Sequence, residues 1–172
     1  RGRFRTIESF LTNGVDANAH GGFFGSALQA AIPSSLSVKE KIQLLELLIQ
    51  SGADVNAQCG PHGSALMHAI MQADWETTKV LVEAGANVNM RRERHHDPMQ
   101  TAGLHAHPLY RDTRDESDTP LQALVAVTMK FGVFERIFDR GEIAGLLLKK
   151  GADVNEEWSG HGSVLQAAAI SG

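Results

Sequence analysis

The sequence predicts an all-α fold in which repeated pairs of helices stack into a solenoid. One segment, an apolar helical end followed by a glycine and a short polar turn, occurs four times, as FLTNGVDAN, LLIQSGADVN, LVEAGANVN and LLKKGADVN. Glycine adopts the left-handed conformation without a Cβ penalty, so this pattern marks the end of a helix. A second segment, a Ser or Thr cap before small and apolar residues, also occurs four times, as GSALQAA, GSALMHA, DTPLQAL and GSVLQAA. It marks the start of a helix, and the two patterns together predict a repeat array with β-turn fingers between the units.

The spacing of these segments divides residues 1–172 into one repeat domain. We expect a partial repeat over 1–18, repeats over about 19–56, 57–89 and 90–155, and a partial repeat over 156–172. The first unit lacks its first helix and the last lacks its second, so the domain is expected to be a fragment of a longer chain.

Two departures from regular spacing predict insertions. Eight residues separate the turn asparagine from the next helix cap at Asn18–Ser26, Asn56–Ser64 and Asn155–Ser163, whereas 30 residues separate Asn89 from Thr119. A long loop insertion is therefore predicted over about 91–117. The same unit is also longer between its two helices, which predicts a helical insertion over about 129–139, one that lengthens a helix or adds one.

In these segments the chain resembles the ankyrin repeat family. The unit SALMHAIMQADWETTKVLVEAGANVN, from Ser64 to Asn89, follows the family's helix–loop–helix–turn pattern without a gap, and the GSALQAA variant is similar to arrays in large fungal proteins. Glutamine or methionine replaces the family's usual histidine in the first helix, and the family's Gly-His pair is replaced by Ala73-Asp74. These replacements are expected to weaken the internal hydrogen-bond network. The residues concerned are Gln29, Met67, Gln122 and Gln166.

Composition argues against several classes of function. The net charge of -4 disfavours a nucleic-acid-binding surface, and no apolar segment is long enough to predict a membrane span. The single cysteine, Cys59, excludes an internal disulfide and is compatible with a reducing compartment. No nucleophile has an orienting base, so an enzyme is not predicted, and we expect no catalytic residues and no cofactor.

The long insertion holds four histidines, which raise the question of a metal site. They lie within thirteen residues, but their spacing matches no common zinc pattern. An incidental surface loop is the preferred interpretation, and metal-dependent ordering of the loop is kept as an alternative. The histidines are His95, His96, His105 and His107.

The resemblance implies that fingertips and first helices contact a protein partner. Exposed Phe and Trp side chains are frequent interaction hot spots. The alternative for the aromatic residues is that they pack under neighbouring repeats and only brace the fingers. The candidate partner-binding residues are Phe23, Phe24, Gln58, His62, His68, Met71, Gln72, Glu157, Trp158 and His161.

The expected function is non-enzymatic protein–protein recognition, by a scaffold that uses the fingers and the concave helix face. The partner is another protein or another part of the parent chain, with no nucleic acid and no membrane, and its identity stays open. The resemblance implies a cytoplasmic or nuclear location. A structural spacer within a longer array of a multidomain signalling protein is the second hypothesis.

Overall fold

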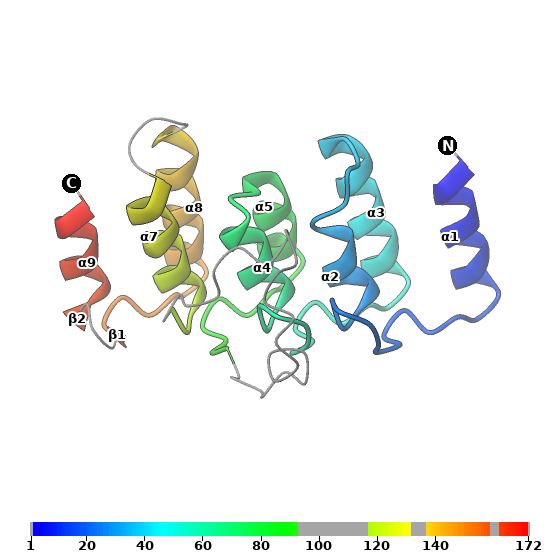
Figure 1. Cartoon of the computed structure of the whole chain (residues 1–172), viewed down its shortest axis with the longest axis horizontal. Coiled ribbons are helices and arrows are strands. Elements are labelled where there is room, and N and C mark those ends of the chain that lie inside the picture. The colour runs from blue at the N-terminus through cyan, green and yellow to red at the C-terminus, as the bar shows by residue number, and fades with distance from the viewer. Residues whose placement is uncertain (1, 93–116, 132–136, 159–161, 172) are drawn as a thin grey trace.

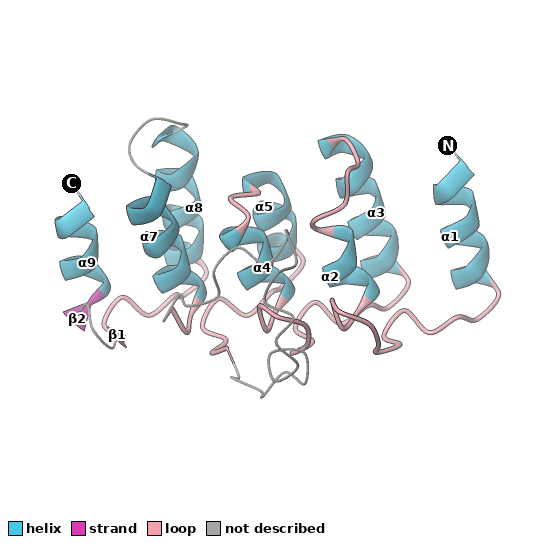
Figure 2. Ribbon diagram, in the orientation of Figure 1, coloured by secondary structure: helices cyan, strands magenta, loops and turns pink. Residues whose placement is uncertain are grey.

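The computed structural model describes residues 2–92, 117–131, 137–158 and 162–171, and in these ranges the chain is mostly helical (Figure 1, Figure 2). The elements occur in this order: α1 (Gly2–Thr12), α2 (Ala27–Ala31), α3 (Val38–Gln50), α4 (Ala65–Met71), α5 (Trp75–Glu83), α7 (Pro120–Phe131), α8 (Ile137–Lys149), β1 (Glu157–Trp158), β2 (Gly162–Ser163) and α9 (Val164–Ser171). The prediction of an all-α fold is confirmed, apart from the small antiparallel sheet of β1 and β2.

The helices form two layers. Helices α2, α4, α7 and α9 contact one another in sequence order, as do α3, α5 and α8, and each first-layer helix before α9 also packs against the second-layer helix that follows it. Figure 1 shows the helix pairs side by side along the long axis of the molecule. One apolar core runs between the layers, with Leu45, Leu66, Leu81 and Leu147 fully buried.

The predicted helix starts are confirmed by their caps. The hydroxyl of Ser26 accepts a hydrogen bond from the backbone N–H of Gln29 at 3.2 Å, and the hydroxyl of Ser64 accepts one from Met67 at 3.2 Å. Thr119 and Ser163 cap α7 and α9 in the same way. Each cap satisfies a donor that the first helical turn would otherwise leave unpaired.

The predicted helical insertion is a lengthening of existing helices in the described residues. Helix α7 has 12 residues where α4 has 7, and α8 has 13 where α5 has 9. The extra residues extend this helix pair beyond its neighbours (Figure 1). Residues 132–136, which fall inside the predicted range of 129–139, lie outside the described part.

The four turns after α1, α3, α5 and α8 have one geometry. Their glycines have φ between +86° and +94°, as the sequence pattern requires; they are Gly14, Gly52, Gly85 and Gly151. Two residues after each glycine, an Asp or Asn side chain accepts a hydrogen bond from the backbone N–H two residues further on, at 2.8–3.0 Å. This local bond fixes the turn without help from the rest of the chain.

The asparagine that ends each turn connects it to the next turn. The Asn56 amide donates to the Gly85 carbonyl at 3.2 Å, and its oxygen accepts from the Asn87 N–H at 2.7 Å. Asn18 and Asn89 make the same two bonds to the turns that follow them, at 2.7–2.9 Å. One side chain per repeat thus satisfies a donor and an acceptor of its neighbour and sets the distance between repeats.

Ala73, between α4 and α5, is the one described non-glycine residue with positive φ, at +54°. Its N–H donates to the Ile70 carbonyl and the N–H of Asp74 donates to Ala69, which ends α4 and holds the strained conformation. Asp74 then caps α5 and forms a half-buried ion pair with Lys41 of α3 at 2.7 Å. The strain at Ala73 is therefore held by bonds on both sides of it.

None of the helices in the described ranges is long and apolar enough to cross a membrane.

Replacement of Asn56 by alanine should lower the free energy of unfolding by about 1–2 kcal/mol, because two hydrogen bonds between turns are lost. The measurement is urea unfolding followed by circular dichroism. Asn155 provides the control, since it has the same turn geometry but its side-chain amide reaches no further turn in the described chain. Asn155→Ala should change stability by less than about 0.5 kcal/mol; equal losses in the two variants would contradict the role given to the bridges.

Ala73→Gly should raise the free energy of unfolding by about 0.5–1 kcal/mol, because glycine adopts positive φ without the strain that alanine has there. Ala84, the C-cap of α5, has φ of -72° and is the matched control. Ala84→Gly should instead destabilise by about 0.5–1 kcal/mol, since it only adds freedom to the unfolded chain. Thermal unfolding of both variants tests the prediction, and a loss of stability in Ala73→Gly would refute it.

Candidate recognition surface

A row of four short hairpins projects from the ends of the helix pairs, and we call these hairpins fingers 1 to 4. Finger 1 is closed by a hydrogen bond from the Gly21 N–H to the Gly25 carbonyl at 2.9 Å, and finger 2 by one from Cys59 to Gly63 at 2.7 Å. Arg92 donates to Asp118 at 2.7 Å in finger 3, and Trp158 pairs with Gly162 in finger 4. The four pairs occupy equivalent places in their repeats.

The long insertion lies at the tip of finger 3. Three residues separate the paired positions in fingers 1, 2 and 4, whereas 25 residues, 93–117, separate Arg92 from Asp118. The prediction of an insertion over about 91–117 thus agrees with the structure at both ends, where Arg92 and Asp118 close the finger. Residues 93–116 lie outside the described part, and so do the four histidines of the predicted loop.

Fingers 1 and 2 are in direct backbone contact. A Cβ on Gly60 would lie 2.5 Å from the Phe24 carbonyl oxygen, and one on Gly25 would lie 2.6 Å from the Cβ of Cys59. Only glycine permits this approach. The Gln29 amide of α2 also donates to the Gly63 carbonyl of finger 2 at 2.9 Å. The first two fingers are therefore closely packed.

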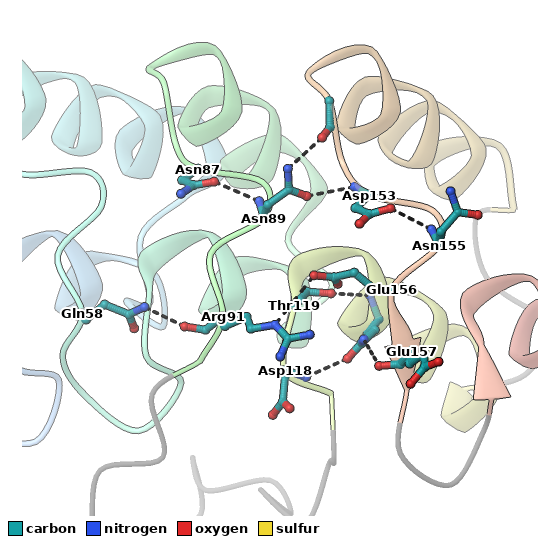
Figure 3. A network of polar contacts seen from close by, with 12 residues as sticks. Gln58, Asn87, Asn89, Arg91, Asp118, Thr119, Asp153, Asn155, Glu156 and Glu157 are labelled. Atoms are coloured by element: carbon teal, nitrogen blue, oxygen red, sulfur yellow. Dashed lines mark hydrogen bonds and ion pairs between the residues drawn. The ribbon is translucent and has the colours of Figure 1, made fainter.

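Fingers 2 and 3 are connected by two short hydrogen bonds. The Gln58 amide donates to the Arg91 carbonyl at 2.8 Å (Figure 3), and the Arg92 guanidinium donates to the Pro61 carbonyl at 2.8 Å. Arg92 is half-buried by this contact. Finger 3 is thus fixed to finger 2 at its base.

The glutamines of the first-layer helices form part of this network, which corrects the expectation that they weaken it. Gln29 bonds to finger 2 as described above. In α7, the Gln122 side-chain oxygen accepts a hydrogen bond from the Asp118 N–H at 2.9 Å, and in α9 the Gln166 oxygen accepts one from Ser163 at 2.7 Å. A glutamine at this position reaches the finger backbone because its amide carries both donors and an acceptor.

Fingers 3 and 4 are farther apart. In the described residues the polar contacts between them are long: Arg91 Nε lies 3.9 Å from the Glu156 carboxylate, and Gln122 Nε2 lies 3.5 Å from the Glu157 carbonyl. At the opposite end of the same repeat, the Asn89 bridge remains short. This junction is therefore closed at the turns and open at the fingers (Figure 3).

A groove of about 760 Å³ occupies the open junction. It is lined by finger 3 (Arg91, Asp118), by α7 and α9 (Gln122, Gln166) and by finger 4 (Glu157, Trp158), together with Asn155, Gly162 and Ser163. Ionisable groups of its lining are one arginine and two carboxylates, so its net charge is negative at neutral pH. We call it the finger 3–4 groove.

A cluster of rings supports finger 2. The rings of His62 and His68 lie 4.4 Å apart, Phe24 stacks on His68 at 5.9 Å, and Phe23 meets Phe24 edge-on at 5.0 Å. His62 and His68 are 3% and 1% exposed, and the Nδ1 atom of each accepts no hydrogen bond from the described chain. Burial, followed by repulsion from His68 and Arg92, lowers the pKa of His62 to about 3. Burial and then Lys41 lower the pKa of His68 to about 4, so both rings are neutral near pH 7.

Three predicted partner-binding residues are buried, which contradicts their predicted role as surface contacts. His62 and His68 belong to the ring cluster, and Trp158 is 3% exposed between Ala126 and Ala167. For Trp158 the bracing alternative holds. The reason is that the fingers fold back on the first-layer helices, so their inner side chains pack against the next repeat.

The other predicted residues are more accessible. Gln72 and Glu157 are exposed, whereas Phe23, Phe24, Gln58 and Met71 are half-buried, and His161 lies outside the described residues. The structure brings Glu157 together with Arg91, Asp118 and Gln122, three groove residues that were missed in sequence reasoning. The pattern that could have revealed them is the Arg92–Asp118 pairing, which the 25 intervening residues conceal.

The nearby thiol is not arranged for nucleophilic chemistry. Burial raises the pKa of Cys59, although a hydrogen bond with Ser26 opposes the shift, and Gln29 Nε2 lies 3.3 Å from its sulfur. A raised pKa keeps the group as a weakly reactive thiol. In the described chain no three His, Cys, Asp or Glu side chains gather as metal ligands.

The histidine pair predicts that the protein loses stability in acid. Below the ordinary histidine pKa of 6.5, the unfolded chain binds protons that the folded protein does not, until the lowered values near 4 and 3 are reached. Stability is therefore lost as pH falls from 6.5 towards 4, by about 1.4 kcal/mol per pH unit for each histidine. Urea unfolding over this range measures the slope, and His68→Gln should reduce it by one histidine's share. Histidine ring resonances of His62 and His68 that titrate near pH 6.5 in the folded protein would refute this account.

Known proteins give no further guide to the site. Neither the protein-family models nor the curated proteins include a match to this chain. The case for a function therefore rests on the fingers, their unequal spacing and the groove.

Proposed function

We propose that this chain is an ankyrin-type repeat solenoid that recognises a protein partner without catalysing a reaction. The observation that carries the proposal is the row of equivalent fingers, held at set distances by the asparagine bridges between turns. The resemblance of the sequence to the ankyrin family, and the two layers of helices, support the same interpretation.

The physical advantage of such a surface is that it is ordered before the partner arrives. Short bonds fix fingers 1, 2 and 3 to one another. Binding then costs little ordering entropy in these fingers, and more of the contact energy remains as affinity. The fingers and the first-layer helices α2, α4, α7 and α9 form the proposed contact surface, with the finger 3–4 groove as its most recessed part.

A cytoplasmic or nuclear scaffold is the cellular role we propose, because the resemblance implies it. The single cysteine needs no disulfide partner and is compatible with a reducing compartment. The partner is another protein or another part of the parent chain.

Photo-cross-linking from defined positions tests the proposal. A photoreactive phenylalanine derivative is placed at Glu157 or Gln166, which line the groove and are exposed, and separately at Glu83 or Lys149, which are exposed on second-layer helices. Irradiation in cells that produce the protein should give a specific protein adduct from the groove positions and none from the second-layer positions.

The control positions decide between recognition and a spacer role. All four substitutions are at exposed sites and should leave the circular dichroism spectrum unchanged. No adduct from Glu157 or Gln166, or adducts only from Glu83 and Lys149, would reject recognition through this face and favour the spacer hypothesis.

A further inference from the structure

We propose that the finger 3–4 groove binds the guanidinium group of an arginine in an extended segment of the partner. This inference rests on the proposed function and specifies the chemistry of its most recessed site. The argument uses the placement of two carboxylates, the position of Arg91 and the room in the groove.

The two carboxylates are brought together by one buried amide. The Gln122 side chain, 2% exposed, accepts from the backbone N–H of Asp118 and lies 3.5 Å from the backbone carbonyl of Glu157. Asp118 and Glu157 are therefore the finger 3 and finger 4 neighbours of a single side chain, and both line the groove. Figure 3 shows them near one another at the base of the two fingers.

Arg91 does not neutralise this pair of carboxylates by a close ion pair. Its nearest carboxylate contact in the described chain is with Glu156, at 3.9 Å, and its side chain is 66% exposed. A pair this long and this exposed contributes little. The groove thus keeps a negative balance, which favours a cationic ligand over a phosphate or a carboxylate.

The form of the cation follows from the arrangement of acceptors. Carboxylates on opposite sides of a groove suit a planar group whose donors point in several directions, as in guanidinium, better than a single ammonium. The volume of about 760 Å³ also lies within the range of sites that hold a short peptide segment. An arginine side chain can enter between the fingers while its backbone follows their tips.

The test is a titration of the ¹⁵N-labelled full chain with capped peptides of the form Gly-Ser-Arg-Ser-Gly, followed by NMR. Shift changes should concentrate on the amides of Gln122, Glu157, Gly162 and Ser163. The citrulline counterpart has nearly the same shape without the charge, and it should bind about tenfold more weakly. The lysine peptide should bind several-fold more weakly than the arginine peptide. Equal binding of citrulline or lysine, or tighter binding of a glutamate peptide, would overturn the proposal.

Variants of the chain sharpen the test. Glu157→Gln and Asp118→Asn should each weaken arginine-peptide binding by about tenfold. Arg91→Gln should strengthen it about two- to threefold, because a competing cation is removed. Glu83→Gln on α5 is the matched control and should have no effect. A uniform loss in all four variants would indicate non-specific charge attraction and would reject a groove site.

The two proposals can fail separately. A protein adduct from Glu157 without arginine-peptide binding would retain the recognition function and reject the guanidinium site. Peptide binding in the groove without any adduct in cells would retain the site chemistry and reject the proposed partner contact.

Discussion

The rest of the structure depends on the amide side chain that ends each turn. Asn18, Asn56 and Asn89 each donate to a glycine carbonyl of the next turn and accept from an N–H two residues beyond it. Apolar packing between the helix layers supplies most of the stabilisation, but it is not directional. The paired hydrogen bonds are directional, and they set how far apart consecutive helix pairs and their fingers lie.

Against this regular spacing, the fingers differ in how closely they meet. Glycine contacts close the first junction and short side-chain bonds close the second, while the contacts across the third are 3.5 Å and 3.9 Å long. The turn bridge at the third junction is as short as the others, so the opening is confined to the finger side. A groove at one defined place results, beside the finger that carries the long insertion.

Buried polar groups do two different tasks in this chain. Gln29 and Gln122 join helices to fingers, and each donor they offer has an acceptor in the finger backbone or nearby. His62 and His68 are buried with unpaired Nδ1 atoms and lowered pKa values, so they fill space under finger 2 as neutral rings. The first arrangement makes the fingers rigid, and the second makes their support sensitive to acid.

The sequence by itself determined the helical class, the turns and the helix starts, because each depends on a few adjacent residues: a glycine at positive φ, an Asp or Asn two residues later, and a Ser or Thr cap. It also located both insertions by their spacing. Only the tertiary structure decided which finger residues are accessible, because burial of His62, His68 and Trp158 depends on the repeat against which each packs. The groove likewise depends on the pairing of Arg92 with Asp118 across 25 residues and on the lengths of contacts between separate fingers. Neither of these is encoded in a local pattern.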